Sequence, residues 1–279
     1  MFAVMSRLSK HRRVLLGLLM LVHPMPLSAQ STSYQPDSVA QIDVLPGWRD
    51  ASGRHTAAIR IRLADGWKTY WRAPGEAGIP PSFDWSGSRN LASVEFHWPR
   101  PEVFIQNGMR TIGYKHELIL PMELTPKNAG RKISLRAQIS LGVCRDVCMP
   151  MQSDLSATLP AQIQGPSPMI KRALDSRPDT AAEAGVGTVS CDVKPIADGL
   201  RLTARMVLPS VGHNEVAVIE TSDQSVWISE AATTRRGKTL TATADLVPSE
   251  GAPFLLNRSD VRITVLAGAR AVDIMGCGS

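Results

Sequence analysis

Hydrophobic and polar residues alternate with a period of two along much of this chain. The alternation is clearest at residues 59–63, 132–141, 200–208 and 261–265, where apolar side chains occupy every second position. A strand with one buried and one wet face has this pattern. Further strands are predicted at residues 39–45, 116–124, 153–159, 216–220, 225–229, 239–246 and 271–275. Many short strands separated by Gly, Pro and Asp predict an all-β fold of sandwiches.

One segment in the middle of the chain interrupts the alternation. Residues 169–174 have helical character, with Ser167 placed as an N-cap and Pro168 at the first turn. The stretch 181–187 that follows is rich in small residues. We therefore expect two β-sandwich domains. The predicted bounds are 30–163 for the first domain, 164–185 for a linker with a short helix and 186–279 for the second domain.

The first 29 residues have the three parts of a secretory signal. A basic start precedes the nine-residue apolar run Val14–Val22, and the segment ends at Leu27-Ser28-Ala29. The run is shorter than the ~20 residues that a membrane-spanning helix needs. We expect cleavage after Ala29 and export to the periplasm, and an uncleaved anchor is the competing interpretation.

This segment also explains most of the formal net charge of +6. Four basic residues and no acidic ones lie in residues 1–29, and without them 27 Lys and Arg face 25 Asp and Glu. The remaining protein is nearly neutral, so its charge does not indicate a nucleic-acid partner. No phosphate-binding loop or Gly-x-Ser-x-Gly motif occurs, and we expect no cofactor.

Aromatic residues gather in the first predicted domain. Five of the six tryptophans fall within residues 48–98, where most should fill a sandwich core. The segment 66–81 differs, because Trp67, Tyr70 and Trp71 precede a loop rich in Gly and Pro. Such a loop can hold an aromatic lid in place.

An exported protein can keep disulfides, so the four cysteines are informative. Cys144 and Cys148 are four positions apart, whereas Cys191 and Cys277 are separated by nearly the whole second domain. The simplest pairing joins each of these two pairs. A Cys191–Cys277 bond would close a long loop and stabilise the fold by about 4 kcal/mol, as a structural disulfide does.

A bond between Cys144 and Cys148 requires the chain to fold back. In one extended strand their Cα atoms would be ~13 Å apart, and a disulfide needs less than ~7 Å. Strand 132–141 and strand 153–159 can supply the two arms, with residues 145–147 in the reversal. A ring this small restricts the unfolded chain little, so thiol–disulfide exchange is a better reason for it.

Neighbouring residues leave the chemistry of this pair open. Arg145 would favour a thiolate at Cys144 and Asp146 would oppose it. A simple hairpin clip is one alternative to exchange. A Cu(I) site is another, because Cys144, Cys148, Met149 and Met151 are all soft ligands; otherwise no metal is expected.

Several motifs, in order, resemble the N-terminal periplasmic domain of the DsbD thiol:disulfide interchange proteins, especially the ScsB-like branch. Over about residues 40–160 they are Gly66–Pro81, Trp98–Pro101, Ile112–Tyr114, Leu118–Pro121 and Cys144–Pro150. In the second region the resemblance to that branch rests on Val226-Trp227, Arg258-Ser259, Val261–Thr264 and Gly276-Cys277.

The resemblance implies immunoglobulin-like sandwiches and a redox role for Cys144 and Cys148 in the periplasm. In the family, the domain takes electrons from a thioredoxin-like domain fed through a membrane domain. It passes them to substrates such as disulfide isomerases, cytochrome c maturation factors or peroxiredoxins. Neighbouring aromatics shield the pair in the family, and Tyr70 and Trp71 are the candidates here.

This sequence departs from the family in having no multi-span region and no Cys-x-x-Cys motif. We therefore expect the electron donor, a thioredoxin-like domain or membrane reductase, to lie on another chain. The leading hypothesis is a protein-disulfide reductase type of electron carrier. A copper-tolerance module and a noncatalytic periplasmic interaction module are the alternatives.

Overall fold

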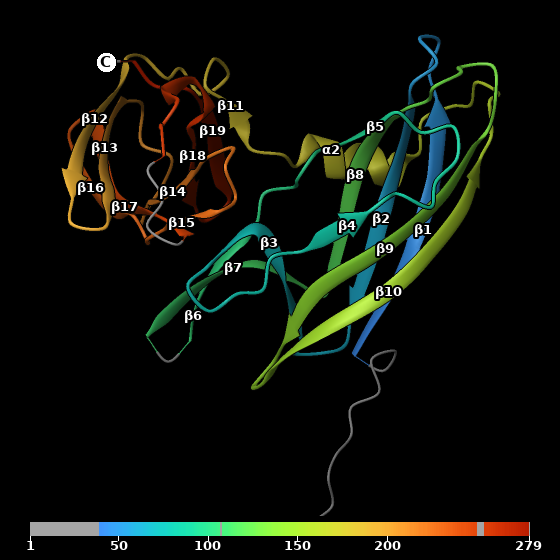
Figure 1. Ribbon diagram of the computed structural model, residues 1–279, viewed down its shortest axis with the longest axis horizontal. Coiled ribbons are helices and arrows are strands. Elements are labelled where there is room, and N and C mark those ends of the chain that lie inside the picture. Colours follow the sequence, from blue (N-terminus) through green and yellow to red (C-terminus); the bar gives the residue numbers. More distant parts are fainter. Residues whose placement is uncertain (1–38, 107, 250–253, 279) are drawn as a thin grey trace, which may run out of the picture. The chain divides into compact units, whose positions relative to one another are not determined.

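The computed structural model describes residues 39–106, 108–249 and 254–278 (Figure 1). The predicted export signal at residues 1–29 lies outside the described residues. Within these ranges, no helix has the length and hydrophobicity needed to cross a membrane.

Residues 40–159 form two antiparallel sheets. The first sheet contains, in spatial order, β1 (Ala40–Arg49), β2 (His55–Leu63), β8 (Glu117–Thr125) and β5 (Ser93–Phe96). The second contains β10 (Cys148–Leu159), β9 (Ile133–Cys144), β3 (Lys68–Gly75), β7 (Met109–Lys115) and β6 (Glu102–Gln106), and β4 (Ser82–Asp84) also pairs with β9. The long β9–β10 hairpin is the light-green pair of strands in Figure 1.

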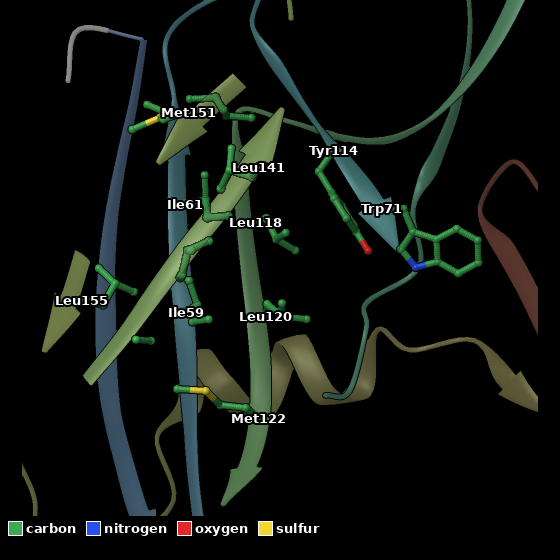
Figure 2. Close-up of a cluster of buried hydrophobic side chains, with 14 of the residues drawn as sticks. Ile59, Ile61, Trp71, Tyr114, Leu118, Leu120, Met122, Leu141, Met151 and Leu155 are labelled. Carbon is green, nitrogen blue, oxygen red and sulfur yellow. The ribbon is translucent and has the colours of Figure 1, made fainter. Parts of the chain in front are cut away.

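Alternate residues of these strands build the first hydrophobic core. Ile59 and Ile61 of β2 and Leu120 of β8 meet Leu135 and Leu141 of β9 in one buried cluster. Figure 2 shows the side chains of Ile59, Ile61, Leu120 and Leu141 between the strands, with Trp71 and Tyr114 beside them. The period-two pattern in the sequence therefore marks the faces that the two sheets bury against each other.

Residues 179–275 form two further sheets around a second core. One sheet contains β11 (Asp179–Thr180), β19 (Arg270–Met275), β18 (Arg262–Ala267) and β14 (Val216–Glu220). The other contains β12 (Val189–Ile196), β13 (Gly199–Val207), β17 (Thr239–Pro248) and β15 (Val226–Ile228), with β16 (Ala232–Arg236) paired to β17. Leu202, Leu240 and Ile263 are among the residues that fill this core.

The predicted all-β class is confirmed, and the sheets pair into immunoglobulin-like sandwiches. In the chain, α2 (Pro168–Asp175) follows the first sandwich and precedes the second, and η2 (Arg258–Asp260) is a single 3-10 turn. Ser167 occupies the N-cap of α2 as predicted, but its side chain makes no capping hydrogen bond. Ile170 and Ala173 are buried, so packing holds the helix in place.

Candidate functional site

The close cysteine pair ends the β9–β10 hairpin. The two strands pair residue by residue from Ile133 and Leu159 to Cys144 and Cys148, whose Cα atoms are 4.2 Å apart. Residues 145–147 make the reversal, and the Arg145 backbone N–H donates to the Val147 carbonyl at 3.3 Å. The predicted Cys144–Cys148 disulfide is confirmed, and both arms extend further than the sequence pattern indicated because the ladder continues to the cysteines.

The two sulfur-bearing residues differ in access to solvent. Cys144 is only 1% exposed, whereas Cys148 belongs to the exposed residues of the turn. Val147, directly before Cys148, is 69% exposed. An incoming group can therefore reach the disulfide from the Cys148 side.

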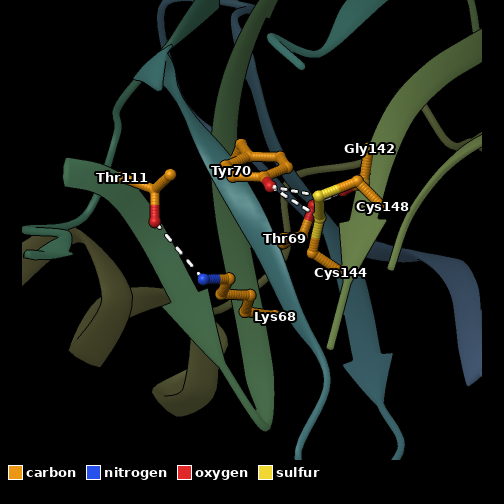
Figure 3. Close-up of a disulfide and its surroundings, with 7 residues drawn as sticks. All are labelled: Lys68, Thr69, Tyr70, Thr111, Gly142, Cys144 and Cys148. Atoms are coloured by element: carbon orange, nitrogen blue, oxygen red, sulfur yellow. Dashed lines mark hydrogen bonds between the residues drawn. A yellow bond between two sulfur atoms is a disulfide. The ribbon is translucent and has the colours of Figure 1, made fainter. Parts of the chain in front are cut away.

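Tyr70 of β3 covers the disulfide (Figure 3). Its hydroxyl donates to Cys144 Sγ at 2.7 Å and lies 3.1 Å from Cys148 Sγ. Tyr70 is 2% exposed, and this burial raises the pKa of its hydroxyl above the ordinary value. The group therefore stays protonated at neutral pH and can donate a hydrogen bond to sulfur.

Two glycines make room for the Tyr70 ring. A Cβ on Gly142 of β9 would lie 2.9 Å from Tyr70 Cδ2, and one on Gly78 would lie 2.9 Å from Tyr70 Cδ1. Such distances are shorter than real contacts of a Cβ atom. The Gly- and Pro-rich loop after β3 thus closes over the ring, and Ile79 of that loop also packs against Gly142.

Trp71, the other predicted shielding residue, lies elsewhere. Consecutive strand residues point to opposite faces, and Trp71 is fully buried within the core cluster (Figure 2). The guanidinium of Arg72 lies 3.9 Å from the centre of its ring. Of the two candidate aromatics, Tyr70 alone has a contact with the disulfide among those described.

The charges next to Cys144 in sequence are paired with each other. Arg145 Nε lies 3.1 Å from Asp146 Oδ2, and the Arg145 guanidinium is 5.7 Å from the centre of the Trp67 ring. Both side chains are largely exposed to solvent, where such a pair has little effect. The sequence left open which of the two charges dominates at Cys144. Because the two charges are paired with each other and solvated, neither clearly dominates there.

The four candidate Cu(I) ligands do not lie on one face. Cys148 pairs with Cys144 on the outer face of the hairpin, whereas Met149 and Met151 pair with Val143 and Leu141 and pack on the core. Within the described ranges, no group of three or more His, Cys, Asp and Glu side chains could hold a metal. The two thiols and two thioethers therefore do not form a common site.

Lys68 is a site residue that the sequence pattern did not reveal. It is the cross-strand partner of Cys144, and its side chain is buried with Nζ 3.3 Å from Thr111 Oγ1. Lys68 and Tyr70 are two positions apart on a strand, so they share a face. The alternation along β3 could have shown that Lys68 and Tyr70 share a face. The pairing of β3 with β9, which brings Lys68 to Cys144, was not visible in the sequence.

The second predicted disulfide, Cys191–Cys277, is also confirmed. It joins residues 86 positions apart, with Cα atoms at 5.7 Å. Cys191 is 3% exposed, and its backbone N–H donates to the Gly278 carbonyl at 2.9 Å. The bond thereby attaches the end of the chain to the start of β12.

Comparisons with known proteins give one family match. Residues 31–160 match the family model described as "Thiol:disulfide interchange protein DsbD, N-terminal". No curated protein matches the chain.

Two solved structures are similar to parts of the chain. The N-terminal periplasmic domain of ScsB from Proteus mirabilis is 23% identical, with a TM-score of 0.61 over 86% of this chain and 92% of that one. This similarity supports the fold described above. The reduced DsbD N-terminal domain from Neisseria meningitidis is 16% identical over 48% of this chain and 96% of that one, and its TM-score of 0.29 is too low to compare folds.

Proposed function

We propose that this protein carries electrons between other proteins through Cys144 and Cys148, because residues 31–160 match the model of the DsbD N-terminal domain, a thiol–disulfide interchange family. The observation that supports this most strongly is the asymmetry of the disulfide. One sulfur belongs to an exposed residue and the other to a buried residue that accepts a hydrogen bond from Tyr70.

The asymmetry assigns different tasks to the two sulfurs. A donor thiolate attacks Cys148 Sγ, a mixed disulfide forms there, and Cys144 leaves as a thiolate. The Tyr70 hydroxyl, 2.7 Å from Cys144 Sγ, is placed to donate to the leaving sulfur. The donor's second thiol then attacks the mixed disulfide, which leaves the donor oxidised and both cysteines of this protein reduced.

The second half of the cycle runs in the opposite direction. The Cys148 thiolate attacks a disulfide in a substrate protein and forms a new mixed disulfide. Cys144 then attacks Cys148 Sγ and releases the reduced substrate, so two electrons have moved and the Cys144–Cys148 bond is restored. Tyr70 stays protonated throughout and serves as a hydrogen-bond donor.

The partners in this proposal are proteins. The donor is a thioredoxin-like domain or membrane reductase on another chain, and the acceptors are periplasmic proteins such as a disulfide isomerase, a cytochrome c maturation factor or a peroxiredoxin. An exposed apolar side chain at the site suits a protein contact: Val147, in the turn between the two cysteines, is 69% exposed.

The proposal also covers the compartment and the division of the chain. Export through residues 1–29 would place the protein in the periplasm, where the ScsB domain from Proteus mirabilis is described. Residues 30–163 would be the redox domain, and residues 186–279 a second sandwich stabilised by its own disulfide.

Single-cysteine variants test the order of attack. A thioredoxin-like protein that lacks its resolving cysteine, with its remaining thiol activated as a mixed disulfide with thionitrobenzoate, serves as the probe. Cys144→Ser leaves the exposed Cys148 and should form the protein–protein disulfide quickly, whereas Cys148→Ser leaves the buried Cys144 and should react at least tenfold more slowly.

Glutathione disulfide provides the control for simple thiol reactivity. If Cys148 reacts with glutathione disulfide but not with the protein probe, the proposed exchange with proteins is wrong. If Cys144 reacts as fast as Cys148, the proposed order of attack is wrong. Mass spectrometry of the trapped peptides identifies the cysteine in each case.

A further inference from the structure

Four residues form one row across four neighbouring strands of the second sheet. Cys148 of β10 pairs with Cys144 of β9, Cys144 pairs with Lys68 of β3, and Lys68 pairs with Lys115 of β7. Directly paired residues project from the same face, with Cβ atoms about 5 Å apart. The row therefore places a lysine beside the buried sulfur, on the side away from Cys148.

Burial disfavours the charge of Lys68, and a hydroxyl and an aromatic ring offset part of that cost. The residue is 8% exposed, with Nζ 3.3 Å from Thr111 Oγ1 and 5.2 Å from the centre of the Phe104 ring. Lys115 Nζ lies over the same ring at 4.5 Å. Burial, and to a lesser extent the charge of Lys115, lower the pKa of Lys68 below its ordinary value.

Lys115 and Arg145, the other cations near this row, each lie close to a carboxylate. Lys115 is exposed and lies 3.8 Å from Glu102 of β6, and in the turn Arg145 pairs with Asp146. Tyr70, which shares the face, keeps its proton because burial raises its pKa. Lys68 is thus a largely buried cation directly across from Cys144, where a negative charge appears when the disulfide is reduced.

We propose that the ammonium group of Lys68 stabilises the thiolate of Cys144 and so tunes the redox pair. When a donor thiolate breaks the disulfide at Cys148, the electron pair of the bond stays on Cys144 Sγ, and the positive charge of Lys68 on the next strand favours that anion. Figure 3 shows Lys68 beside Cys144, with its ammonium end turned toward Thr111. The relevance of this effect to turnover rests on the proposed function.

The effect must be reciprocal. If Lys68 favours the thiolate, then the thiolate favours the charged form of Lys68, because both describe one interaction free energy. In the oxidised protein Lys68 has a cationic neighbour on β7, and in the reduced protein it gains an anionic neighbour on β9. Reduction should therefore raise the pKa of Lys68.

The first experiment compares thiolate formation in the Cys148→Ser background, where Cys144 is the one free thiol. Lys68→Met keeps the length of the side chain and removes the charge. We expect the pKa of Cys144, followed by thiolate absorbance, to rise by about one unit, which lowers the thiolate fraction about tenfold. In the two-cysteine protein, at a pH above this pKa where reduced Cys144 is a thiolate, the same one-unit shift lowers the reduction potential by up to about 30 mV.

Two matched variants separate charge from packing. Lys68→Arg keeps a cation and should leave the pKa of Cys144 nearly unchanged. Lys115→Met removes a cation from the same face one strand further away and should shift the pKa of Cys144 by less than a third as much. An unchanged pKa in Lys68→Met, or equal shifts in Lys68→Met and Lys115→Met, would overturn the proposal.

A second measurement uses the unmodified protein and needs no variant to fold. Lysine side chains labelled with carbon-13 allow the pKa of Lys68 to be followed by NMR in the oxidised and reduced states. A higher pKa on reduction is expected, and an equal or lower one would contradict the proposal. Neither measurement involves a partner protein, so a failure of protein exchange and a failure of this inference are distinguishable.

Discussion

The two disulfides of this protein differ in loop length, in exposure to solvent and in the hydrogen bonds that their sulfurs accept. Cys144–Cys148 spans four positions at the end of a hairpin, has one exposed residue and accepts a hydrogen bond from Tyr70. Cys191–Cys277 spans 86 positions and lies against the core of the second sandwich. Within the described part of the chain, neither of its sulfurs accepts a side-chain hydrogen bond.

The length of the closed loop sets how much a disulfide stabilises the fold, whereas access to its sulfurs sets how readily it can exchange. By chain entropy, closing the 86-residue loop stabilises the fold by about 4.5 kcal/mol, and closing the short one by only about 2 kcal/mol. Exchange requires the opposite features, an attackable sulfur and a stabilised leaving thiolate. The short disulfide has an exposed Cys148 and a hydroxyl beside Cys144 Sγ, which suit the proposed exchange.

The largest effect should come from removing one member of each pair and measuring exchange. Cys148→Ser should reduce turnover with a thioredoxin-like donor and a disulfide substrate to background, because the exposed sulfur is lost and the buried Cys144 alone cannot close a disulfide within the hairpin. Cys277→Ser should leave turnover nearly unchanged at a temperature where it stays folded. Equal losses in both variants would show that the two disulfides are not specialised as described.

The same contrast predicts a reversed order for stability. Replacing both Cys191 and Cys277 by Ala should lower the free energy of unfolding of their sandwich by about 4 to 5 kcal/mol. Replacing both Cys144 and Cys148 by Ala should cost about 2 kcal/mol or less. Urea unfolding followed by tryptophan fluorescence checks this, with one fit for each transition. A larger cost for the close pair would contradict the division of roles.

Gly142→Ala should damage the cover of the disulfide. The new methyl group would lie 2.9 Å from the Tyr70 ring and 2.7 Å from Ile79 Cβ, so the ring and the loop must move. We expect a loss of about 1 to 3 kcal/mol of stability and faster reduction of the disulfide by glutathione. Gly165→Ala is the matched control, because a Cβ there meets nothing within 4 Å. Equal reduction rates in the two variants would argue against a covering role for Tyr70.

The smallest effect is expected from Tyr70→Phe, which keeps the ring and removes the hydroxyl. Loss of a hydrogen bond to an ionised sulfur should raise the pKa of Cys144 in the reduced protein by about one unit. Tyr114→Phe is the control, because the Tyr114 hydroxyl donates to the Pro99 carbonyl at 2.8 Å. Thiolate absorbance measures both variants, and the account fails if Tyr114→Phe shifts the pKa of Cys144 as much.

Local pattern was enough to predict the class of fold and both disulfides. Alternation at 132–141 indicated a strand, and the short spacing of Cys144 and Cys148 demanded a reversal that the structure has at residues 145–147. The separate faces of Cys148 and Met149 were also predictable, since consecutive strand residues point in opposite directions. Strand alternation by itself thus argues against a copper site shared by these two residues.

The functional details that the sequence did not predict depend on contacts between distant strands. Lys68 and Cys144 are paired only because β3 lies beside β9, a choice that alternation does not fix. The position of Tyr70 depends on Gly142 from one strand and Gly78 from a loop. Tyr70 and Trp71 were equal candidates in sequence, and only the register of β3 determined which of them faces the disulfide.

We propose that one disulfide of this protein exchanges with other proteins and that the other stabilises the fold. Equilibrating the protein in redox buffers of graded potential, alkylating free thiols and quantifying the four cysteine peptides by mass spectrometry measures both bonds in one molecule. We expect Cys144 and Cys148 to become reduced at a potential above about −300 mV, while Cys191 and Cys277 stay oxidised there. Reduction of both pairs together, or of Cys191–Cys277 first, would contradict the account.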